Sequence, residues 1–324
     1  MTYTIPKEFE GQPLRAYLLR GLGLSHRLLA RLKVLPDGIT LDGQRVTVRT
    51  ILHAGARLAL AIEDEGDTER IVPSGVMPRV LYEDSDLIVC DKSGDMPTHP
   101  SHGHFDDTLA NALASYDLDR HGHPLPFRPV NRLDRETSGT VLIARHALAA
   151  ARLSEQMQSK RIRKVYLALL DGSIPESGTV TAPIRRAQPS IILREIRSPD
   201  AEGAQTAITH YRTVAAWQVP NGQTRTLVLA FPETGRTHQL RLHFAHLSAP
   251  IMGDGLYGRE DTADRPSRQL LHALSLTFSH PTTNAPMHVV APVPDEIWQR
   301  IPTEHRASVK HTVDQPLVEF HSDS

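Results

Sequence analysis

One segment, VNRLDRETSGTVLIAR at residues 130–145, constrains the chain more than any other. Its first half gathers arginines and acids around a single leucine over residues 132–136, and a Thr-Ser-Gly turn then leads into an apolar stretch over 140–144. The pattern predicts a carboxylate flanked by guanidiniums at the mouth of a buried strand. Two interpretations are open at this point: a structural ion pair that fixes a turn, or a carboxylate kept ionised for chemistry.

The alternation of side chains along an extended segment makes Asp134 the residue of interest. Arg132 and Asp134 project to the same side of such a segment, and Arg135 projects to the other. A guanidinium close to a carboxylate favours its charged form. An ionised aspartate directed at a cleft can act as a nucleophile or can stabilise a developing cation.

The chain as a whole divides into a small N-terminal unit and a larger second unit. Residues 1–65 read as helix, helix and hairpin, with helical apolar spacing over 13–20, a second helix over 26–33 and period-two alternation around Asp42-Gly43. The acidic and then Pro/Gly-bearing stretch 66–79 predicts a linker.

The second unit is predicted to span residues 80–305 and to be followed by a polar tail, 306–324, that is a candidate for disorder. Apolar runs and helical spacing alternate along it. The expected strands lie at 140–144, 164–170, 208–217 and 225–232, and the expected helices at 109–114, 147–159 and 237–247.

Composition excludes several classes of protein. Cys90 is the only cysteine, so neither a disulfide framework nor a four-cysteine zinc site is available. The N-terminus lacks the charged-then-apolar pattern of a signal peptide, and no stretch of about 18 apolar residues suits a membrane span. We expect a soluble, cytoplasmic protein.

The distribution of charge is more informative than the net charge of −1. Residues 11–60 carry eight Lys/Arg against two acids, and residues 145–164 hold a second basic run with one acid. Basic patches attract phosphates whatever the total charge. Solvated faces with no ligand are the alternative interpretation.

Two further segments carry candidate chemistry. In PETGRTHQLRLHFAHL, 232–247, Thr237 is a potential N-cap, and His238 and Arg241 lie one helical turn apart. Arg241 could therefore be the partner of Asp134, or it could be an ordinary surface arginine. In RIRKVYLALL, Tyr166 opens a buried strand, where its ring could stack on a base or simply fill the core.

These segments resemble, in order, the motifs of the RluA/RluD-type pseudouridine synthase family. RLDRETSG resembles the family's RLD-x-x-TSG motif, DSDLIVCDKSGDMPTHP its lysine loop, KVYLALL its tyrosine strand, TGRTHQLRLHFAHLSAPIMGDGLYG its longest motif and QLLHALSLTFSHP its closing strand. The resemblance covers about residues 80–295. Residues 11–62 resemble, more loosely, the S4-like RNA-binding domain that many members carry.

The resemblance implies an α+β fold with a mixed, largely antiparallel sheet flanked by helices and loops, preceded by the small S4-like domain. It places the catalytic aspartate at Asp134, the tyrosine that lies against the target uracil at Tyr166, and the basic partner of the aspartate at Arg241. Arg132 takes the position of an arginine that can enter the space left by the flipped nucleotide. The chain departs from the family pattern at Asn131, where histidine is usual, and at Ser93, where proline is usual.

The implied function is isomerisation of specific uridines in structured RNA to pseudouridine. Large-subunit ribosomal RNA is the expected substrate and transfer RNA an alternative, with the chain acting as a monomer. The expected RNA-binding residues are Arg27, Arg31, Lys33, Arg132, Arg135, Arg236 and His238. The reaction needs no cofactor, and neither His99, His102 and His104 nor His243 and His246 form a recognisable zinc motif, so no metal is expected.

Two alternatives are kept. A non-catalytic RNA-binding or ribosome-assembly protein could use the same fold. A nucleoside hydrolase or glycosidase would release free uracil, but such hydrolases usually need two carboxylates, and these motifs offer one.

Overall fold

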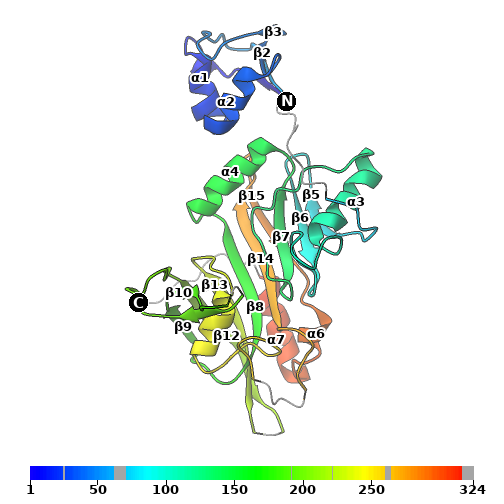
Figure 1. The fold of residues 1–324 in the computed structure, drawn as a ribbon, viewed down its shortest axis with the longest axis vertical. Coiled ribbons are helices and arrows are strands. Elements are labelled where there is room, and N and C mark those ends of the chain that lie inside the picture. Colours follow the sequence, from blue (N-terminus) through cyan, green and yellow to red (C-terminus); the bar gives the residue numbers. More distant parts are fainter. Residues whose placement is uncertain (25, 62–70, 191, 221, 260–263, 316–324) are drawn as a thin grey trace.

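The computed structural model describes residues 1–24, 26–61, 71–190, 192–220, 222–259 and 264–315, and the side chain of Arg27 lies outside the described part. The chain forms a small unit around a four-stranded sheet and a larger unit around a nine-stranded sheet (Figure 1). A short two-stranded hairpin stands beside the larger sheet.

The small unit has its four strands in the order β1-β4-β2-β3. Asp42 and Gly43 both have positive φ, 50° and 80°, which fits the tight turn predicted from their sequence. The first predicted helix is present over residues 14–21, where an α-helical turn passes directly into a π-helical turn. The elements of this unit are β1 (Thr2–Thr4), η1 (Lys7–Phe9), α1 (Leu14–Ala16), η2 (Tyr17–Gly21), α2 (His26–Val34), β2 (Ile39–Leu41), β3 (Gln44–Arg45) and β4 (Arg57–Leu60).

The larger sheet has the order β5-β6-β7-β14-β8-β13-β12-β9, with β15 paired to β14. Its pairs are antiparallel except for β7 with β14, which confirms the mixed, largely antiparallel sheet. Its strands are β5 (Arg79–Glu83), β6 (Leu87–Lys92), β7 (Ser138–Ala144), β8 (Arg163–Asp171), β9 (Ser177–Thr181), β12 (Ile208–Gln218), β13 (Thr224–Pro232), β14 (Leu271–Ser279) and β15 (Pro286–Val290). The separate hairpin is formed by β10 (Ile184–Arg186) and β11 (Arg194–Ile196).

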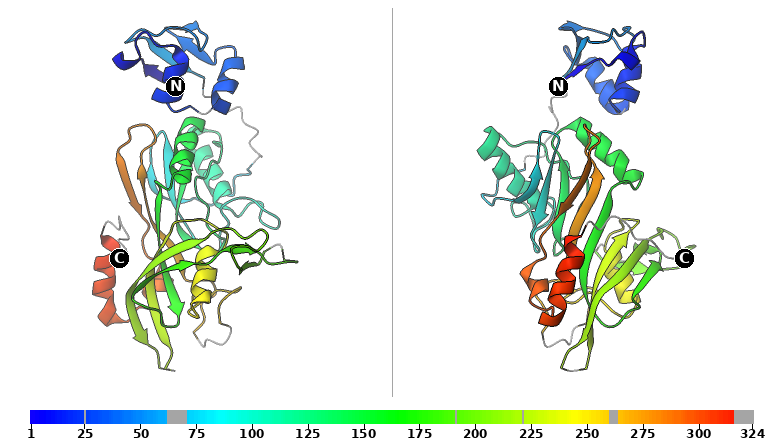
Figure 2. Two further views of the ribbon diagram at one scale, coloured as in Figure 1. Left: turned by 90° about the vertical axis from the view of Figure 1, so that its left-hand side faces the viewer. Right: turned by 180° about the vertical axis from the view of Figure 1, so that it is seen from behind.

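Helices cover both faces of this sheet. They are α3 (Leu109–His121), α4 (Ala147–Gln158), α5 (Gln239–His246), α6 (Asp295–Trp298) and α7 (Thr303–Asp314). On β8, Leu167 and Leu169 pack toward α6 and α7, whereas Ala168 and Leu170 pack toward α5. Figure 2 shows α7 and α5 on opposite sides of these strands. The alternation follows from the two-residue period of a strand, so Tyr166 lies on the α5 face.

Helix α4 also forms the contact between the two units. Leu148 belongs to the apolar core of the small unit, and Arg152 donates from Nε to the carbonyl of Leu22 at 2.8 Å. A second nitrogen of Arg152, Nη1, donates to the carbonyl of Pro281 at 2.7 Å in the larger unit. The small unit therefore rests on α4, at the end of the larger unit seen in Figure 1.

The prediction of a polar, disordered tail from residue 306 is wrong over residues 306–314, because these residues belong to helix α7. Val309 and Val313, one turn apart, are buried in the same core as Leu167. Two valines at helical spacing are a weak signal in a polar sequence, and their burial depends on a surface supplied by β8 and β12. The rest of the predicted tail, from residue 316, lies outside the described residues.

Among the described residues, no helix has both the length and the apolar composition required to cross a membrane.

Candidate active site

A cavity of about 880 Å³ lies on the α5 face of the sheet. Its walls come from the 130–137 segment before β7, the first half of β8, the end of β13 and the first turn of α5. Of the residues singled out from the sequence, those that line it are His99, Asn131, Arg132, Asp134, Tyr166, Arg236, Thr237, His238 and Arg241. The fold thus brings together three motifs that lie far apart along the chain.

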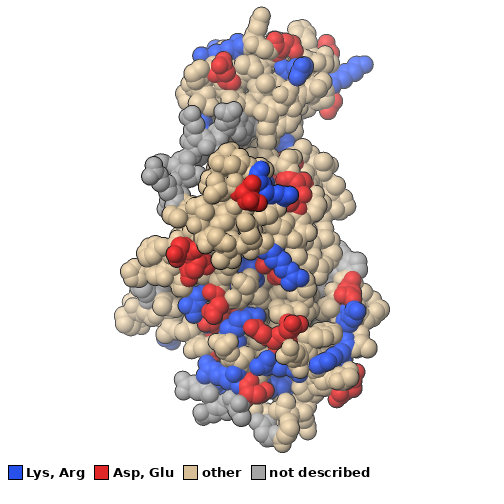
Figure 3. All heavy atoms as spheres, turned by 90° about the vertical axis from the view of Figure 1, so that its right-hand side faces the viewer, with Lys and Arg blue, Asp and Glu red and all other residues tan. Residues whose placement is uncertain are grey.

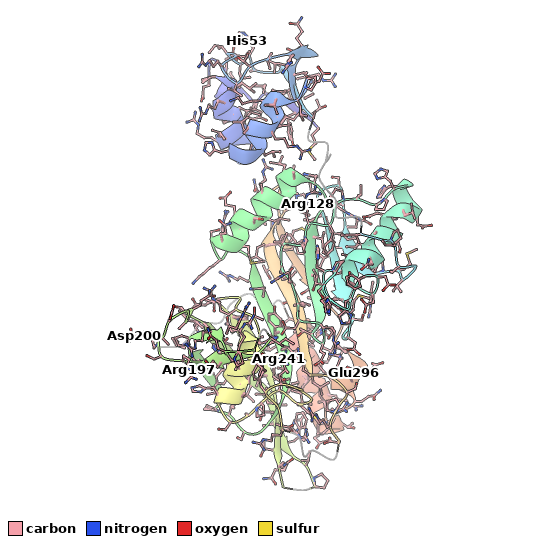
Figure 4. All side chains as sticks on the ribbon, viewed as in Figure 1. His53, Arg128, Arg197, Asp200, Arg241 and Glu296 are labelled. Atoms are coloured by element: carbon pink, nitrogen blue, oxygen red, sulfur yellow. The ribbon has the colours of Figure 1, made fainter. Side chains whose placement is uncertain are left out.

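Asp134 and Arg241 form an ion pair in this cavity. Nη1 of Arg241 lies 3.6 Å from Oδ2 of Asp134. The Asp134 side chain is 30% exposed, whereas that of Arg241 is 6% exposed. The carboxylate can therefore meet a molecule in the cavity, while the guanidinium is buried. Figure 4 shows Arg241 on helix α5.

Asp254 fixes the position of Arg241. Nε and Nη2 of Arg241 donate to the two oxygens of Asp254 at 2.7 Å each, in the bidentate geometry of a strong pair. Burial acts to raise the pKa of Asp254, but the hydrogen bonds and charge of Arg241 outweigh it and lower that pKa. Asp254 also accepts the backbone N–H groups of Leu256 and Tyr257.

The sequence reasoning did not single out Asp254, although it lies inside the longest family-like motif. The sequence feature that could have identified Asp254 was a carboxylate between two glycines in the Gly-Asp-Gly part of that motif. Its partner could not be inferred, because the contact to Arg241 depends on how the loop after α5 folds back.

Tyr166 lies beside this ion pair. Burial, together with the negative charge of Asp134, raises the pKa of the Tyr166 phenol above its ordinary value, so its hydroxyl remains protonated at neutral pH. The ring can contribute a stacking surface, and the hydroxyl can serve as a hydrogen-bond donor.

The loop that carries Asp134 is held by buried polar groups. Lys92 is fully buried, and its Nζ donates to the carbonyls of Ser93, Met96 and Arg135 at 2.8, 2.6 and 2.9 Å. Burial, with the charge of Arg268, lowers the pKa of Lys92 to about 7. The hydrogen bond to Arg135 fixes the carbonyl of the residue that follows Asp134.

The loop is followed by Gly139, a position at which the backbone requires glycine. Its φ is 112°, and a Cβ added there would lie 2.2 Å from the carbonyl oxygen of Ala273 on β14. No other residue type fits this backbone conformation and this close strand approach. The Thr-Ser-Gly turn therefore sets how β7 pairs with β14.

Asn131, a departure from the family pattern, has a structural role in this chain. It is buried, its Nδ2 donates to the Thr140 carbonyl at 3.1 Å, and its Oδ1 accepts the Leu142 N–H at 2.8 Å. The side chain thus ties the 130–134 segment to β7. Ser93, the other departure, lies in the loop whose carbonyls hold Lys92.

The expected arrangement of arginines around Asp134 needs correction. Arg132 is exposed and lines the cavity, but it makes no hydrogen bond or ion pair with any part of the chain that the structure describes. Arg135 pairs with Asp95 at 3.7 Å and Glu136 at 3.5 Å and does not line the cavity. The guanidinium at Asp134 therefore comes from α5 rather than from its sequence neighbours.

Helix α5 begins later than predicted. His238, not Thr237, is its N-cap, with a φ of 58° and no side-chain cap bond. The side chain of Gln239 instead holds the turn that precedes the helix, because its Oε1 accepts from the backbone N–H of Arg236 at 3.0 Å and from the Thr234 hydroxyl at 2.8 Å. His238 Nδ1 lies 3.0 Å from the Tyr257 hydroxyl at the cavity wall.

The remaining predicted RNA-binding residues are dispersed. Arg236 lines the cavity and donates to the Thr206 carbonyl at 3.1 Å. Arg31 and Lys33 lie on α2 in the small unit, away from the cavity, and the side chain of Arg27 is outside the described part.

The basic run over 145–164 does not form one basic face, which corrects its interpretation as a phosphate-binding patch. Arg145 is buried between Glu83 and Asp117, and Arg152 is engaged at the junction of the two units. Lys160 pairs with Glu233 at 3.1 Å. Figure 3 likewise shows basic and acidic side chains intermixed on the face that it displays.

One of the histidines considered for a metal, His243, is held by other contacts. His243 is buried between the Thr209 hydroxyl and the Ala182 carbonyl, at 2.9 and 3.0 Å. Within the described ranges, one group has metal-like spacing, formed by Asp84, Asp86 and His280. Its members hydrogen-bond to one another and to neighbouring side chains, and they lie outside the cavity.

Comparison with known proteins identifies relatives of this chain. The family model described as RNA pseudouridylate synthase matches residues 86–246. An RNA pseudouridine synthase of Bacillus subtilis, YjbO, is 34% identical over 88% of this chain and 96% of its own length. The ribosomal large subunit pseudouridine synthase D of Xanthomonas campestris is 35% identical over 79% of this chain and 78% of its own.

Solved structures give the same result. Human RNA pseudouridylate synthase domain containing 1 is 29% identical and superposes with a TM-score of 0.55, over 71% of this chain and 86% of its own. The fold, the relatives and the ordered motifs agree: this chain belongs to the RNA pseudouridine synthase family, whose members are isomerases that act on RNA.

Proposed function

We propose that the chain converts specific uridines of large-subunit ribosomal RNA to pseudouridine, with Asp134 as the catalytic carboxylate. The observation that carries the assignment of Asp134 is its ion pair with Arg241, 3.6 Å long, at the wall of a cavity that Tyr166 also lines. The choice of ribosomal RNA is supported by the names of relatives such as that of Xanthomonas campestris. A cytoplasmic monomer is part of the proposal.

The reaction sets the demands on the site. The bond from C1′ to N1 of uracil breaks, the ring turns, a bond from C1′ to C5 forms, C5 loses its proton and N1 gains one. No atom or electron is exchanged with a second substrate, so the proposal includes no cofactor. Asp134 either attacks C1′ or removes the 2′ proton. A primary isotope effect with 2′-deuterated uridine would assign the second route, and its absence would assign the first.

The neighbours of Asp134 then take separate roles. Arg241, held from behind by Asp254, pairs with the carboxylate and keeps it in place. Tyr166 offers its ring to the detached uracil while the base turns, and base–aromatic stacking contributes about 1–3 kcal/mol per base. Arg132, exposed and without a partner in the described residues, is available to the RNA from which the uridine has been extruded.

The small unit is proposed to bind RNA as an S4-like domain, through Arg31 and Lys33 on α2 and through Arg27 in the same segment. Exchanging both Arg31 and Lys33 for alanine should weaken RNA binding and reduce its salt dependence, because phosphate contacts release counterions. Conversion of bound RNA in a single turnover should change little.

The function is tested by mapping pseudouridines in total RNA from cells with and without this chain. We expect one or a few positions in large-subunit ribosomal RNA to lose pseudouridine when the chain is absent, and to regain it when the wild-type chain is restored. Loss at positions in transfer RNA alone would contradict the proposed substrate. An unchanged map would contradict the proposed function.

A further inference from the structure

Lys164 differs from the other cations of the basic run over 145–164. It lies on β8 two residues before Tyr166, so both side chains are on the same face of the strand, and both line the cavity. Within the described parts of the chain, no carboxylate or hydrogen-bond acceptor pairs with its ammonium group. By contrast, Lys160 in the same wall is paired with Glu233.

The ammonium group of Lys164 lies next to the turn at Gly235, which also lines the cavity. A Cβ built on that glycine would lie 3.5 Å from Nζ of Lys164, and apart from the glycine's chain neighbours no other atom would lie within 4 Å of it. Burial lowers the pKa of Lys164, and no carboxylate offsets this effect. Burying an ammonium group without a counter-charge costs free energy, and a bound anion would offset that cost.

The order of side chains along β8 indicates which anion this is. The negative charge of Asp134 acts on the phenol of Tyr166. Lys164 lies on the same wall, one strand repeat before Tyr166 along β8. A uridine extruded toward Asp134 and Tyr166 remains joined to its strand through the phosphodiesters on either side of its ribose. A cation one strand repeat from the base-binding ring is placed to meet one of these phosphates.

We infer that Lys164 and the turn at Gly235 form a binding subsite for one phosphodiester that flanks the target uridine. This inference rests on the proposed function and deepens it, because it identifies a part of the substrate that the site recognises besides the base. Lys164 is a substrate-positioning residue in this account, and the phosphate contact holds the extruded nucleotide in the cavity.

The experiment uses the full-length chain and a synthetic RNA hairpin carrying the uridine that the wild-type protein converts. In a set of such hairpins, each phosphate near the target is replaced, one at a time, by an uncharged methylphosphonate. Binding and single-turnover conversion are measured for the wild type, for Lys164→Met and for Lys310→Met. Lys310 is exposed on α7, outside the cavity lining, and so provides the same substitution away from the site.

We expect the wild type to lose about tenfold in affinity at one methylphosphonate position next to the target, as for loss of a charged hydrogen bond. Lys164→Met should bind the unmodified hairpin about tenfold more weakly, should show no further loss at that one position, and should have a log–log salt slope smaller by about 0.7. Lys310→Met should match the wild type. Identical position-by-position profiles for the wild type and Lys164→Met would overturn the inference.

Gly235→Ala provides a test that leaves the charge in place and decides the question if Lys164→Met does not fold. Apart from its chain neighbours, the added methyl group would approach only Nζ of Lys164, so it should narrow the space for a phosphate beside that ammonium group and weaken binding at the same phosphate. The inference would be overturned if Gly235→Ala bound the unmodified hairpin as tightly as the wild type does and lost the same affinity as the wild type at each methylphosphonate position. Conversion of the unmodified hairpin by the wild type checks the proposed function separately, so the two failures can be told apart.

Discussion

Arg241 is bound more closely to Asp254 than to Asp134: two hydrogen bonds of 2.7 Å join it to Asp254, and 3.6 Å separates it from Asp134. Asp254 is fully buried, whereas Asp134 is open to the cavity. The arginine is thus positioned by one aspartate so that it can act on the other.

The first prediction concerns Asp254→Asn. The neutral amide cannot balance the buried guanidinium, and breaking a buried ion pair typically costs about 3–5 kcal/mol. We expect a lower urea midpoint and, at temperatures where the variant is folded, about 100-fold slower single-turnover conversion, because Arg241 is displaced. Asp200→Asn, at an exposed position outside the cavity lining, is the control. Wild-type conversion by Asp254→Asn would show that Arg241 needs no such support.

Lys92 predicts a specific pH dependence of stability. Its pKa falls from 10.5 in the unfolded chain to about 7 in the folded protein, so between these pH values the unfolded chain binds more protons. Stability contributed through this group therefore rises with pH across that window. The difference in urea stability between the wild type and Lys92→Met should grow in favour of the wild type from pH 7 to pH 10. A stability difference that stays constant from pH 7 to pH 10 would contradict the lowered pKa of the buried Lys92.

Arg152 is predicted to hold the small unit against α4. Arg152→Ala removes the donors to the carbonyls of Leu22 and Pro281, a loss of about 2 kcal/mol at this contact. We expect a larger radius of gyration by small-angle X-ray scattering. Arg161→Ala, which removes an exposed pair with Glu155 close to the end of the same helix, should leave the scattering unchanged. Equal scattering from both variants would contradict the proposed role of Arg152.

Asn131 is predicted to stabilise the 130–134 segment that carries Asp134. Asn131→Ala leaves the Thr140 carbonyl and the Leu142 N–H without their side-chain partner, and unsatisfied buried groups cost about 1–3 kcal/mol each. Urea unfolding should report this loss, while Gln299→Ala, at an exposed position, should change stability little. Equal stability of the two variants would mean that water replaces the amide.

Much of this fold could be predicted from local sequence. The apolar run of β8 and the Asp42-Gly43 turn are specified by their own residues, because strand alternation and turn conformation are local properties. The ordered motifs also indicated that Asp134, Tyr166 and Arg241 belong to one site, and the structure places all three at one cavity.

The parts that sequence did not predict depend on partners distant in the chain. Arg145 belongs to a basic run in sequence, yet Glu83 and Asp117 neutralise it inside the protein. The last helix is stabilised by burial of Val309 and Val313 against strands that precede it by many residues. Asp254 and Lys164 acquire their significance only when the loop after α5 and the start of β8 are seen beside the cavity.

The most direct test of the account is single-turnover conversion of the mapped uridine by Asp134→Asn, which keeps the shape of the side chain and removes its charge. Folding is checked by circular dichroism and RNA affinity by filter binding, and both should stay near wild type. We predict no detectable pseudouridine with the variant, against complete conversion and no free uracil with the wild type. Pseudouridine formed by Asp134→Asn at a rate near that of the wild type, or uracil released by the wild type, would contradict the account.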